Sequence, residues 1–204
     1  MKKLLFSLAV ALCAAVVAAA EVIQLPPPQR EGGAAFFTLL NARRSQRRFI
    51  EEALTPQQLS TLLWAGFGES GAGGKRTAPT AVNRQEFTLY AILADGAYKY
   101  LPKTNELEKI TGEDLRPLAK GNVTAPVYIL IVADMKRAAS SEYAAIDAGY
   151  ISQNLYLAAG ALQLGSCALG SFRRDNENVA KLAAKLKFGA NDKALLSQAV
   201  GKLK

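Results

Sequence analysis

The chain has 204 residues, with 25 Lys and Arg against 17 Asp and Glu, and a formal net charge of +8. It contains no histidine, which excludes Ser-His-Asp and Cys-His catalysis and the usual general base near pH 7. With two cysteines and no histidine, neither a zinc site nor a haem site is expected. The basic residues are mostly scattered and match no nucleic-acid-binding module, so we expect no nucleic-acid partner.

The first twenty residues predict a signal peptide. Lys2-Lys3 precedes an apolar run over residues 4–17 that is too short to span a bilayer, and Ala18-Ala19-Ala20 offers a small-residue cleavage site. We therefore expect a periplasmic or extracellular protein with no stable membrane span after cleavage. Lipid attachment at Cys13 and a retained N-terminal anchor are the alternatives.

Residues 21–33, with Pro26-Pro27-Pro28, predict an extended arm or linker, and residues 34–204 predict one domain. The domain begins with a short apolar helix over residues 34–42. Thr55 is a predicted N-cap, with Pro56 at the first helical position and Gln58 at the third, for a helix that runs to Gly68. After cleavage Cys167 is the one remaining cysteine, and we interpret its thiol as inert packing.

The rest of the domain alternates strands and helices. Residues 86–94 alternate in polarity, and Asp95-Gly96 predicts a hairpin turn into the next strand. Residues 140–164 are small and apolar on almost every side, which predicts a long buried central helix. The expected fold class is α+β, a mainly antiparallel sheet flanked by helices. Its other expected elements are strands at 98–101, 106–110, 126–133 and 193–200, a helical turn at 113–119, a strand or loop at 166–170, and an Asp175-capped helix at 176–187.

A basic cluster follows the first short helix. Arg43, Arg44, Ser45 and Arg47 supply charged forks and a hydroxyl, the groups that bind phosphate. Some of these arginines could instead complement the negative C-terminal end of the preceding helix. Downstream, Thr77-Ala-Pro-Thr-Ala-Val-Asn83 is an extended stretch of small polar side chains before a strand, suited to a flat hydrogen-bonding ring.

Together the two stretches resemble the FMN-dependent nitroreductase family, in which an Arg-x-Ser-x-Arg/Lys segment precedes a Pro-Ser-x-x-Asn-x-Gln segment. The resemblance covers about residues 34–204 and implies FMN as cofactor and a homodimer. It also implies that Arg43, Arg44 and Ser45 hold the FMN phosphate and ribityl chain. Arg47 would lie at the pyrimidine edge of the flavin, where a cation stabilises the negative charge of the reduced ring.

The second segment corresponds to family positions that reach the flavin from the partner subunit: Pro79, Thr80, Ala81 and Asn83. The sequence departs from the commonest family pattern in Ala81 for Ser and in Glu86 for Pro. Its lead-in, Gly74-Lys-Arg-Thr-Ala-Pro79, is more similar to the thiazoline/oxazoline-oxidase branch of the family. Taken alone, the segment is an ordinary polar loop, and we interpret Gln85 as structural.

Residues 147–166 resemble the central helix of the family, and Gln153 and Asn154 are expected to find partners across a subunit interface. The following loop aligns Gly170 and Ser171 with backbone that approaches flavin N5, which glycine permits. Lys202 and Lys204 lie where the family brings late basic residues to the phosphate, although a solvated basic tail is the alternative.

The expected function is an exported FMN-dependent oxidoreductase that works by a ping-pong mechanism through flavin N5. Its substrate would be a small organic molecule such as a nitroaromatic or a quinone. No side chain is expected to act as nucleophile or obligatory base, so catalysis would be flavin-borne, with Arg47 tuning the flavin. The alternative is a non-catalytic protein that binds flavin or another anionic ligand and retains the fold.

Overall fold

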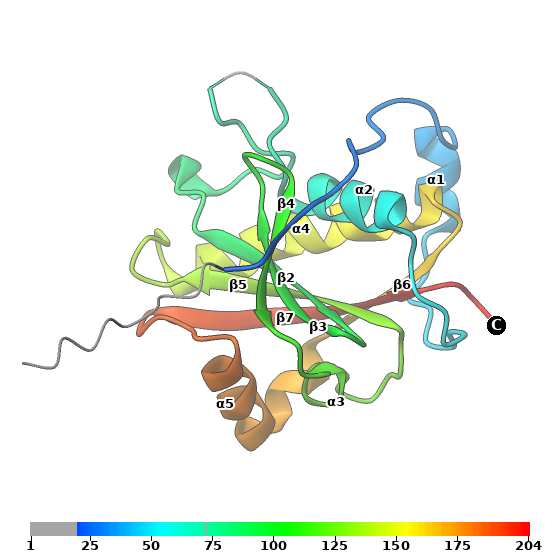
Figure 1. The fold of residues 1–204 in the computed structure, drawn as a ribbon. Coiled ribbons are helices and arrows are strands. Elements are labelled where there is room, and N and C mark those ends of the chain that lie inside the picture. The colour runs from blue at the N-terminus through cyan, green and yellow to red at the C-terminus, as the bar shows by residue number, and fades with distance from the viewer. Residues whose placement is uncertain (1–19, 72) are drawn as a thin grey trace, which may run out of the picture.

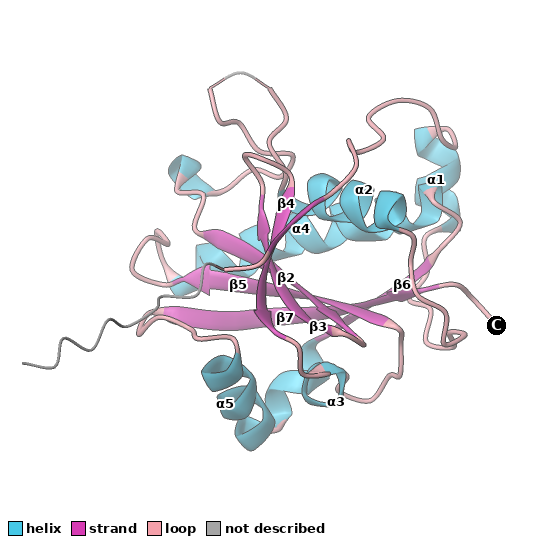
Figure 2. Ribbon diagram, viewed as in Figure 1, coloured by secondary structure: helices cyan, strands magenta, loops and turns pink. Residues whose placement is uncertain are grey.

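A computed structural model describes residues 20–71 and 73–204; the predicted signal peptide therefore lies almost wholly outside the described residues. Seven strands form one sheet in the order β1-β4-β3-β2-β5-β7-β6, and every pair of neighbours is antiparallel (Figures 1 and 2). The strands are β1 (Val22–Gln24), β2 (Phe87–Leu93), β3 (Gly96–Leu101), β4 (Glu106–Thr111), β5 (Val127–Asp134), β6 (Gly165–Leu169) and β7 (Asp192–Gly201). The α+β class expected from the sequence is confirmed.

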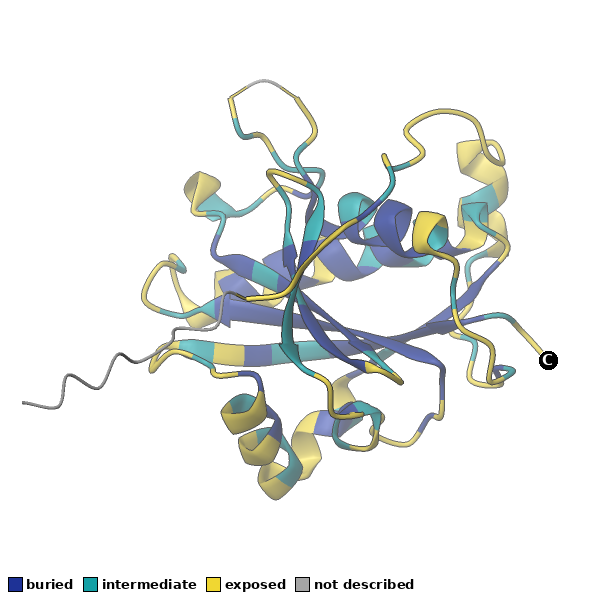
Figure 3. Cartoon of the chain, in the orientation of Figure 1, coloured by how far each residue is buried: buried dark blue, intermediate teal, exposed yellow. Residues whose placement is uncertain are grey.

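Helices cover both faces of the sheet (Figure 1). On one face lie α1 (Phe36–Ala42), α2 (Pro56–Phe67) and α4 (Ser141–Ala161); on the other lie α3 (Arg116–Ala119) and α5 (Asn176–Lys185). Two short 3-10 helices, η1 (Ala81–Asn83) and η2 (Gly170–Arg174), complete the described elements. The sheet divides the core into two apolar clusters, one under each layer of helices, and β5, between β2 and β7, contributes alternate residues to both (Figure 3).

The helix starts follow from their caps. The Gln58 backbone N–H donates to Thr55 Oγ1 at 3.1 Å, and the Thr55 N–H donates to Gln58 Oε1 at 2.9 Å, which is the predicted capping box. Asp175 accepts from the Asn178 N–H and caps α5 as predicted. Among the described residues, no helix is long and apolar enough to cross a membrane.

Two expectations need correction. Residues 21–33 were expected to form an extended arm or linker, but Val22–Gln24 is part of the domain's sheet, where it pairs with β4 as the edge strand. The long helix was expected to be buried all round, but within one chain only one face of α4 is covered. Tyr143, Ile146 and Tyr150 on its other face are 52%, 44% and 46% exposed. These positions lie on one side of the helix because three or four residues make about one turn.

Candidate functional site

The predicted basic cluster lies beside the C-terminal end of the chain. The Gln46 N–H donates to the Ser166 carbonyl in β6 at 2.9 Å, and the Ile50 N–H donates to the Lys202 carbonyl at 3.1 Å. Phe49 is buried between these contacts and pairs with Leu203. The fold thus gathers the early and late cations that the sequence assigned to one site, and Arg48 lies among them. We define the basic strip as these six residues: Arg43, Arg44, Arg47, Arg48, Lys202 and Lys204.

Tyr156 of α4 connects the basic strip to the sheet. The Arg43 guanidinium stacks 5.1 Å from the centre of its ring, and Ser45 Oγ and the Tyr156 hydroxyl are hydrogen-bonded at 2.9 Å. The same hydroxyl accepts the Ala168 N–H of β6 at 2.8 Å. Cation–π and hydrogen-bond contacts therefore orient Arg43 and Ser45. The sequence places Tyr156 in the central helix, but nothing in the pattern separates it from that helix's core residues.

The cations of the strip differ in what they contact. Arg44 donates to the carbonyls of Asn41 and Arg43 at 2.9 and 2.8 Å, so it caps α1, as the alternative interpretation predicted. Lys202 pairs with Glu52. Within residues 20–71 and 73–204, Arg43, Arg47, Arg48 and Lys204 form no salt bridge with a carboxylate. These four cations of the strip are thus available to an anion.

Gly170 and Ser171 follow β6 and begin η2. Gly170 is exposed, and a Cβ built on it would meet no atom within 4 Å, so the space in front of its backbone is open. Ser171 Oγ donates to Asn122 Oδ1 at 3.0 Å, on the turn before β5. Its side chain is therefore engaged with that turn and makes no described contact with the basic strip.

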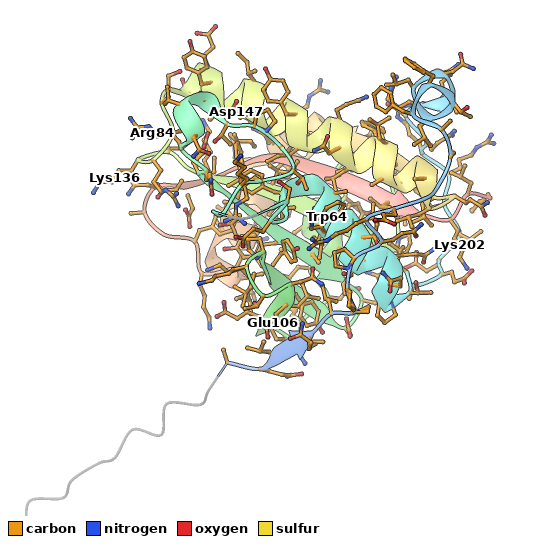
Figure 4. The ribbon with its side chains drawn as sticks, turned by 90° about the horizontal axis from the view of Figure 1, so that it is seen from above. Trp64, Arg84, Glu106, Lys136, Asp147 and Lys202 are labelled. Carbon is orange, nitrogen blue, oxygen red and sulfur yellow. The ribbon has the colours of Figure 1, made fainter. Side chains whose placement is uncertain are left out.

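The Pro79–Asn83 segment lies at the other end of α4. The Ala81 N–H donates to Asp147 Oδ2 at 2.7 Å, near the start of the helix. Tyr156 follows nine residues later, about 13 Å along the helix axis. Figure 4 accordingly shows Asp147 and Lys202 at opposite ends of the molecule. One chain therefore does not bring the two predicted halves of the site together.

The turn that contains this segment has an uncommon backbone. Val82, Asn83 and Gln85 adopt left-handed conformations with φ of 46°, 53° and 47°. The Gln85 N–H donates to Thr80 Oγ1 at 2.9 Å, and Gln85 Nε2 donates to Asn83 Oδ1 at 3.0 Å. Left-handed conformations in non-glycine residues are unfavourable and persist only where surrounding contacts hold them. Gln85 is structural, as expected, and it holds this turn.

Asn154, expected to find a partner across a subunit interface, donates to the Thr77 carbonyl of its own chain at 3.2 Å. It also lines a cavity of about 450 Å³ between the arm, α2 and α4, together with Trp64. Figure 4 labels Trp64. None of the predicted cofactor-binding residues lines this cavity. Cys167 is buried, in agreement with a packing role.

Two buried carboxyl groups, Glu86 and Asp147, meet beneath the turn, and no sequence pattern predicts that they lie together. Glu86 and Asp147 are each 2% exposed, and within the described part of the chain neither Glu86 carboxyl oxygen has a hydrogen-bond partner. Burial raises the pKa of Glu86, and the charge of Asp147 raises it further, while Arg137 opposes the shift. Glu86 therefore retains its proton to higher pH than an exposed glutamate does.

Replacing Glu86 with Gln should raise the melting temperature at neutral and alkaline pH. Above the ordinary glutamate pKa of 4.5, the unfolded chain loses the proton that the folded chain retains. Wild-type stability therefore falls as pH rises from 4.5 through the raised pKa, whereas the amide has no proton to lose. Below pH 4.5 the two proteins should melt together.

The control is Gln at the exposed Glu31, which should not change the pH dependence. Melting curves measured across the pH range decide the point. A difference between wild type and the Glu86 variant that is the same at every pH would contradict a buried, proton-retaining Glu86.

Known proteins share this fold and resemble the chain in sequence. A structure from Ralstonia eutropha JMP134, provisionally named a nitroreductase, superimposes with a TM-score of 0.81 at 30% identity, covering 90% of each chain. A provisionally named nitroreductase from Desulfovibrio desulfuricans, solved in complex with FMN, superimposes with a TM-score of 0.61 at 24% identity, over 82% of this chain and 85% of that one. The chain therefore has the nitroreductase fold, in which helices cover both faces of one antiparallel sheet.

The sequence comparisons assign the family. The nitroreductase family model matches residues 40–202. A provisionally named nitroreductase of Methanocaldococcus jannaschii is 30% identical over 158 residues, which cover 68% of this chain and 79% of that protein. The chain belongs to the nitroreductase family. Its class is therefore an FMN-dependent oxidoreductase, as the sequence predicted.

Proposed function

We propose that this protein oxidises or reduces a small organic molecule in two half-reactions, with FMN held by the basic strip. The observation that carries the proposal is the set of cations Arg43, Arg47 and Arg48, which have no carboxylate partner among the described residues. Arg43 is pre-oriented by Tyr156, as phosphate recognition by a planar guanidinium requires. These groups suit FMN, which when bound supplies the hydride-accepting N5.

In this proposal the protein binds, orients and stabilises charge. Arg43 and Ser45 take the phosphate and ribityl chain, Arg47 faces the pyrimidine edge of the ring, and the backbone at Gly170 faces N5. Arg44 contributes less directly than the family resemblance implied, because its guanidinium caps α1. The proposal assigns no acid–base step to a side chain. The chain has no histidine, and the Glu86 carboxyl is buried beneath the turn.

We further propose a homodimer in which each FMN lies between two subunits. Support comes from the separation of the two half-sites along α4 and from the exposed apolar face of that helix. Phe36 and Phe37 on α1 are also 57% and 81% exposed. Apolar patches of this kind are typical of interfaces. A second chain would bring its Pro79–Asn83 segment to the basic strip of the first.

Replacing Arg47 with Ala should lower the two-electron midpoint potential of bound FMN. A fixed cation near N1 and C2=O stabilises the anionic reduced flavin more than the neutral oxidised flavin. We expect a decrease of about 30–60 mV, since 30 mV corresponds to about 1.4 kcal/mol for a two-electron couple. Potentiometric titration measures it.

The matched control is Arg48→Ala, which removes the same charge from the neighbouring position. If the midpoint potential depended only on the total charge of the strip, both variants would lower it equally. Equal midpoints in wild type and the Arg47 variant would assign Arg47 to the phosphate side or to the solvated surface.

We propose that the protein reduces a nitroaromatic, a quinone or a related small acceptor. Oxidation of a small organic donor is the physiological direction to test. Similarity of the Arg76-Thr-Ala-Pro79 lead-in to the thiazoline/oxazoline-oxidase branch favours the oxidising direction. Steady-state assays of the FMN-loaded protein with nitroaromatics and quinones test turnover. Bound FMN without turnover of any acceptor would favour the non-catalytic alternative.

Export is part of the proposal and rests on the Lys2-Lys3 start, the apolar run and the Ala18–Ala20 cleavage site. Mass spectrometry of the native protein should find a mature chain that begins at Glu21. A cytoplasmic protein that retains Met1, or a lipid-modified chain that begins at Cys13, would contradict it.

A further inference from the structure

The sheet opens between β2 and β3. These strands pair from Tyr90 with Lys99 to Leu93 with Gly96, and the pairing goes no further toward the start of β2. There, Phe87 and its neighbours pair with β5, while the last residues of β3 pair with β4. A cavity of about 210 Å³ lies at the opening, between α2, the two strands and the turn before β2.

The cavity is lined by three basic residues, Arg76, Lys99 and Arg137, and no acidic residue is among the described residues that line it. None of the three takes part in a salt bridge within the described ranges. Three carboxyl groups lie near them without lining the cavity: Glu86 interacts with Arg137, Glu108 is opposite Lys99 in the β3–β4 register, and Glu69 forms a backbone bridge with Arg76. The cavity therefore carries excess positive charge.

Arg76 is held in a fixed orientation at this cavity. Its Nε donates to Gln85 Oε1 at 3.1 Å, and its guanidinium stacks 5.5 Å from the centre of the Phe67 ring. Its Nη1 is buried and has no hydrogen-bond partner in the described structure. A buried donor on a charged group is costly to leave unpaired, so an acceptor is expected beside it.

We propose that this cavity binds a small oxyanion, either a phosphate or the carboxylate of a small organic acid, with Arg76 Nη1 as its central donor. Lys99 and Arg137 add positive charge from the sheet and from the turn after β5. The site is separate from the basic strip and shares no residue with it. Planar guanidinium groups recognise both kinds of oxyanion, and the volume exceeds the roughly 30 Å³ that one water occupies in the liquid.

The anion site is connected to the turn that we place at the flavin. Gln85, which orients Arg76, also donates to Asn83 Oδ1 and to the Gly74 carbonyl, both at 3.0 Å. An anion that fixes Arg76 therefore also stabilises the left-handed turn at Val82 and Asn83. This second step rests on the proposed function, whereas anion binding itself does not.

The test is a titration of the purified FMN-loaded protein with phosphate and, separately, with acetate, at constant ionic strength set by chloride. A saturable rise in melting temperature is expected with at least one of the two anions. Arg76→Gln should weaken that binding about tenfold or more, since hydrogen bonds to charged groups contribute about 1.5–3 kcal/mol. Lys136→Gln is the matched control, because exposed Lys136 precedes Arg137 and does not line the cavity.

Bound FMN occupies the basic strip in this experiment, which separates the two sites. A response that is absent from the FMN-loaded protein and present only after FMN is removed would place the anion on the strip and overturn the proposal. Lys99→Gln should weaken binding and replaces Arg76→Gln if that variant does not fold. An unchanged response in the cavity variants, or no saturable response of the wild type to either anion, would also overturn it. Response to phosphate alone or to acetate alone identifies the class of anion.

Discussion

Replacing Gly96 with Ala should lower the free energy of unfolding by about 2–4 kcal/mol, through backbone strain and a steric clash. Gly96 has φ of 149°, and a Cβ built on it would lie 2.3 Å from the Thr111 carbonyl oxygen. That oxygen belongs to the paired backbone of β4, so it cannot move aside as a flexible side chain could. Urea denaturation of the two proteins measures the difference.

Gly112, in the same part of the sheet, provides the control. A Cβ there would come no closer than 3.9 Å to any atom, so Gly112→Ala should be nearly neutral. Equal losses of stability in the two variants would show that glycine at position 96 is not required by the β3–β4 contact.

Replacing Arg43 with Ala should weaken FMN binding about ten- to a hundredfold, because a charge-assisted hydrogen bond contributes about 1.5–3 kcal/mol. Arg43 is a cation of the basic strip that stacks on Tyr156 and has no carboxylate partner among the described residues. The substitution removes the guanidinium group, whereas the backbone pairing of Phe49 with Leu203 remains. Titration of the apoprotein with FMN, followed by flavin fluorescence, gives the affinities.

Lys181, an exposed cation on α5 that pairs with Glu177, is the control. Lys181→Ala should bind FMN like the wild type. A well-folded Arg43 variant with unchanged affinity would exclude the basic strip as the phosphate site, and the anion cavity beside Arg76 would then be the next candidate.

Local signals predicted most of the secondary structure. The Thr55–Gln58 capping box, the Asp95-Gly96 turn and the continuous apolar run of β5 each specify an element through neighbouring residues alone. The edge strand β1 was missed because three exposed residues show no alternation, and their pairing with β4 depends on residues far along the chain.

The candidate site was predictable in part. The basic cluster and the late lysines are recognisable in the sequence, and the fold brings them together. Tyr156, the buried pair Glu86 and Asp147, and the orientation of Arg76 could not be predicted, because each depends on tertiary contacts. Glu86 was visible in the sequence only as a departure from the family pattern, and the structure shows that this departure buries a carboxyl group beneath the turn.

Sedimentation velocity of the FMN-loaded protein, recorded at the visible absorbance of the flavin and in the ultraviolet, tests whether two chains share each FMN. A single dimer boundary is expected at both wavelengths, with one FMN per chain. A flavin-bearing monomer would contradict the shared site, and a flavin boundary that separates from the protein would contradict FMN binding itself.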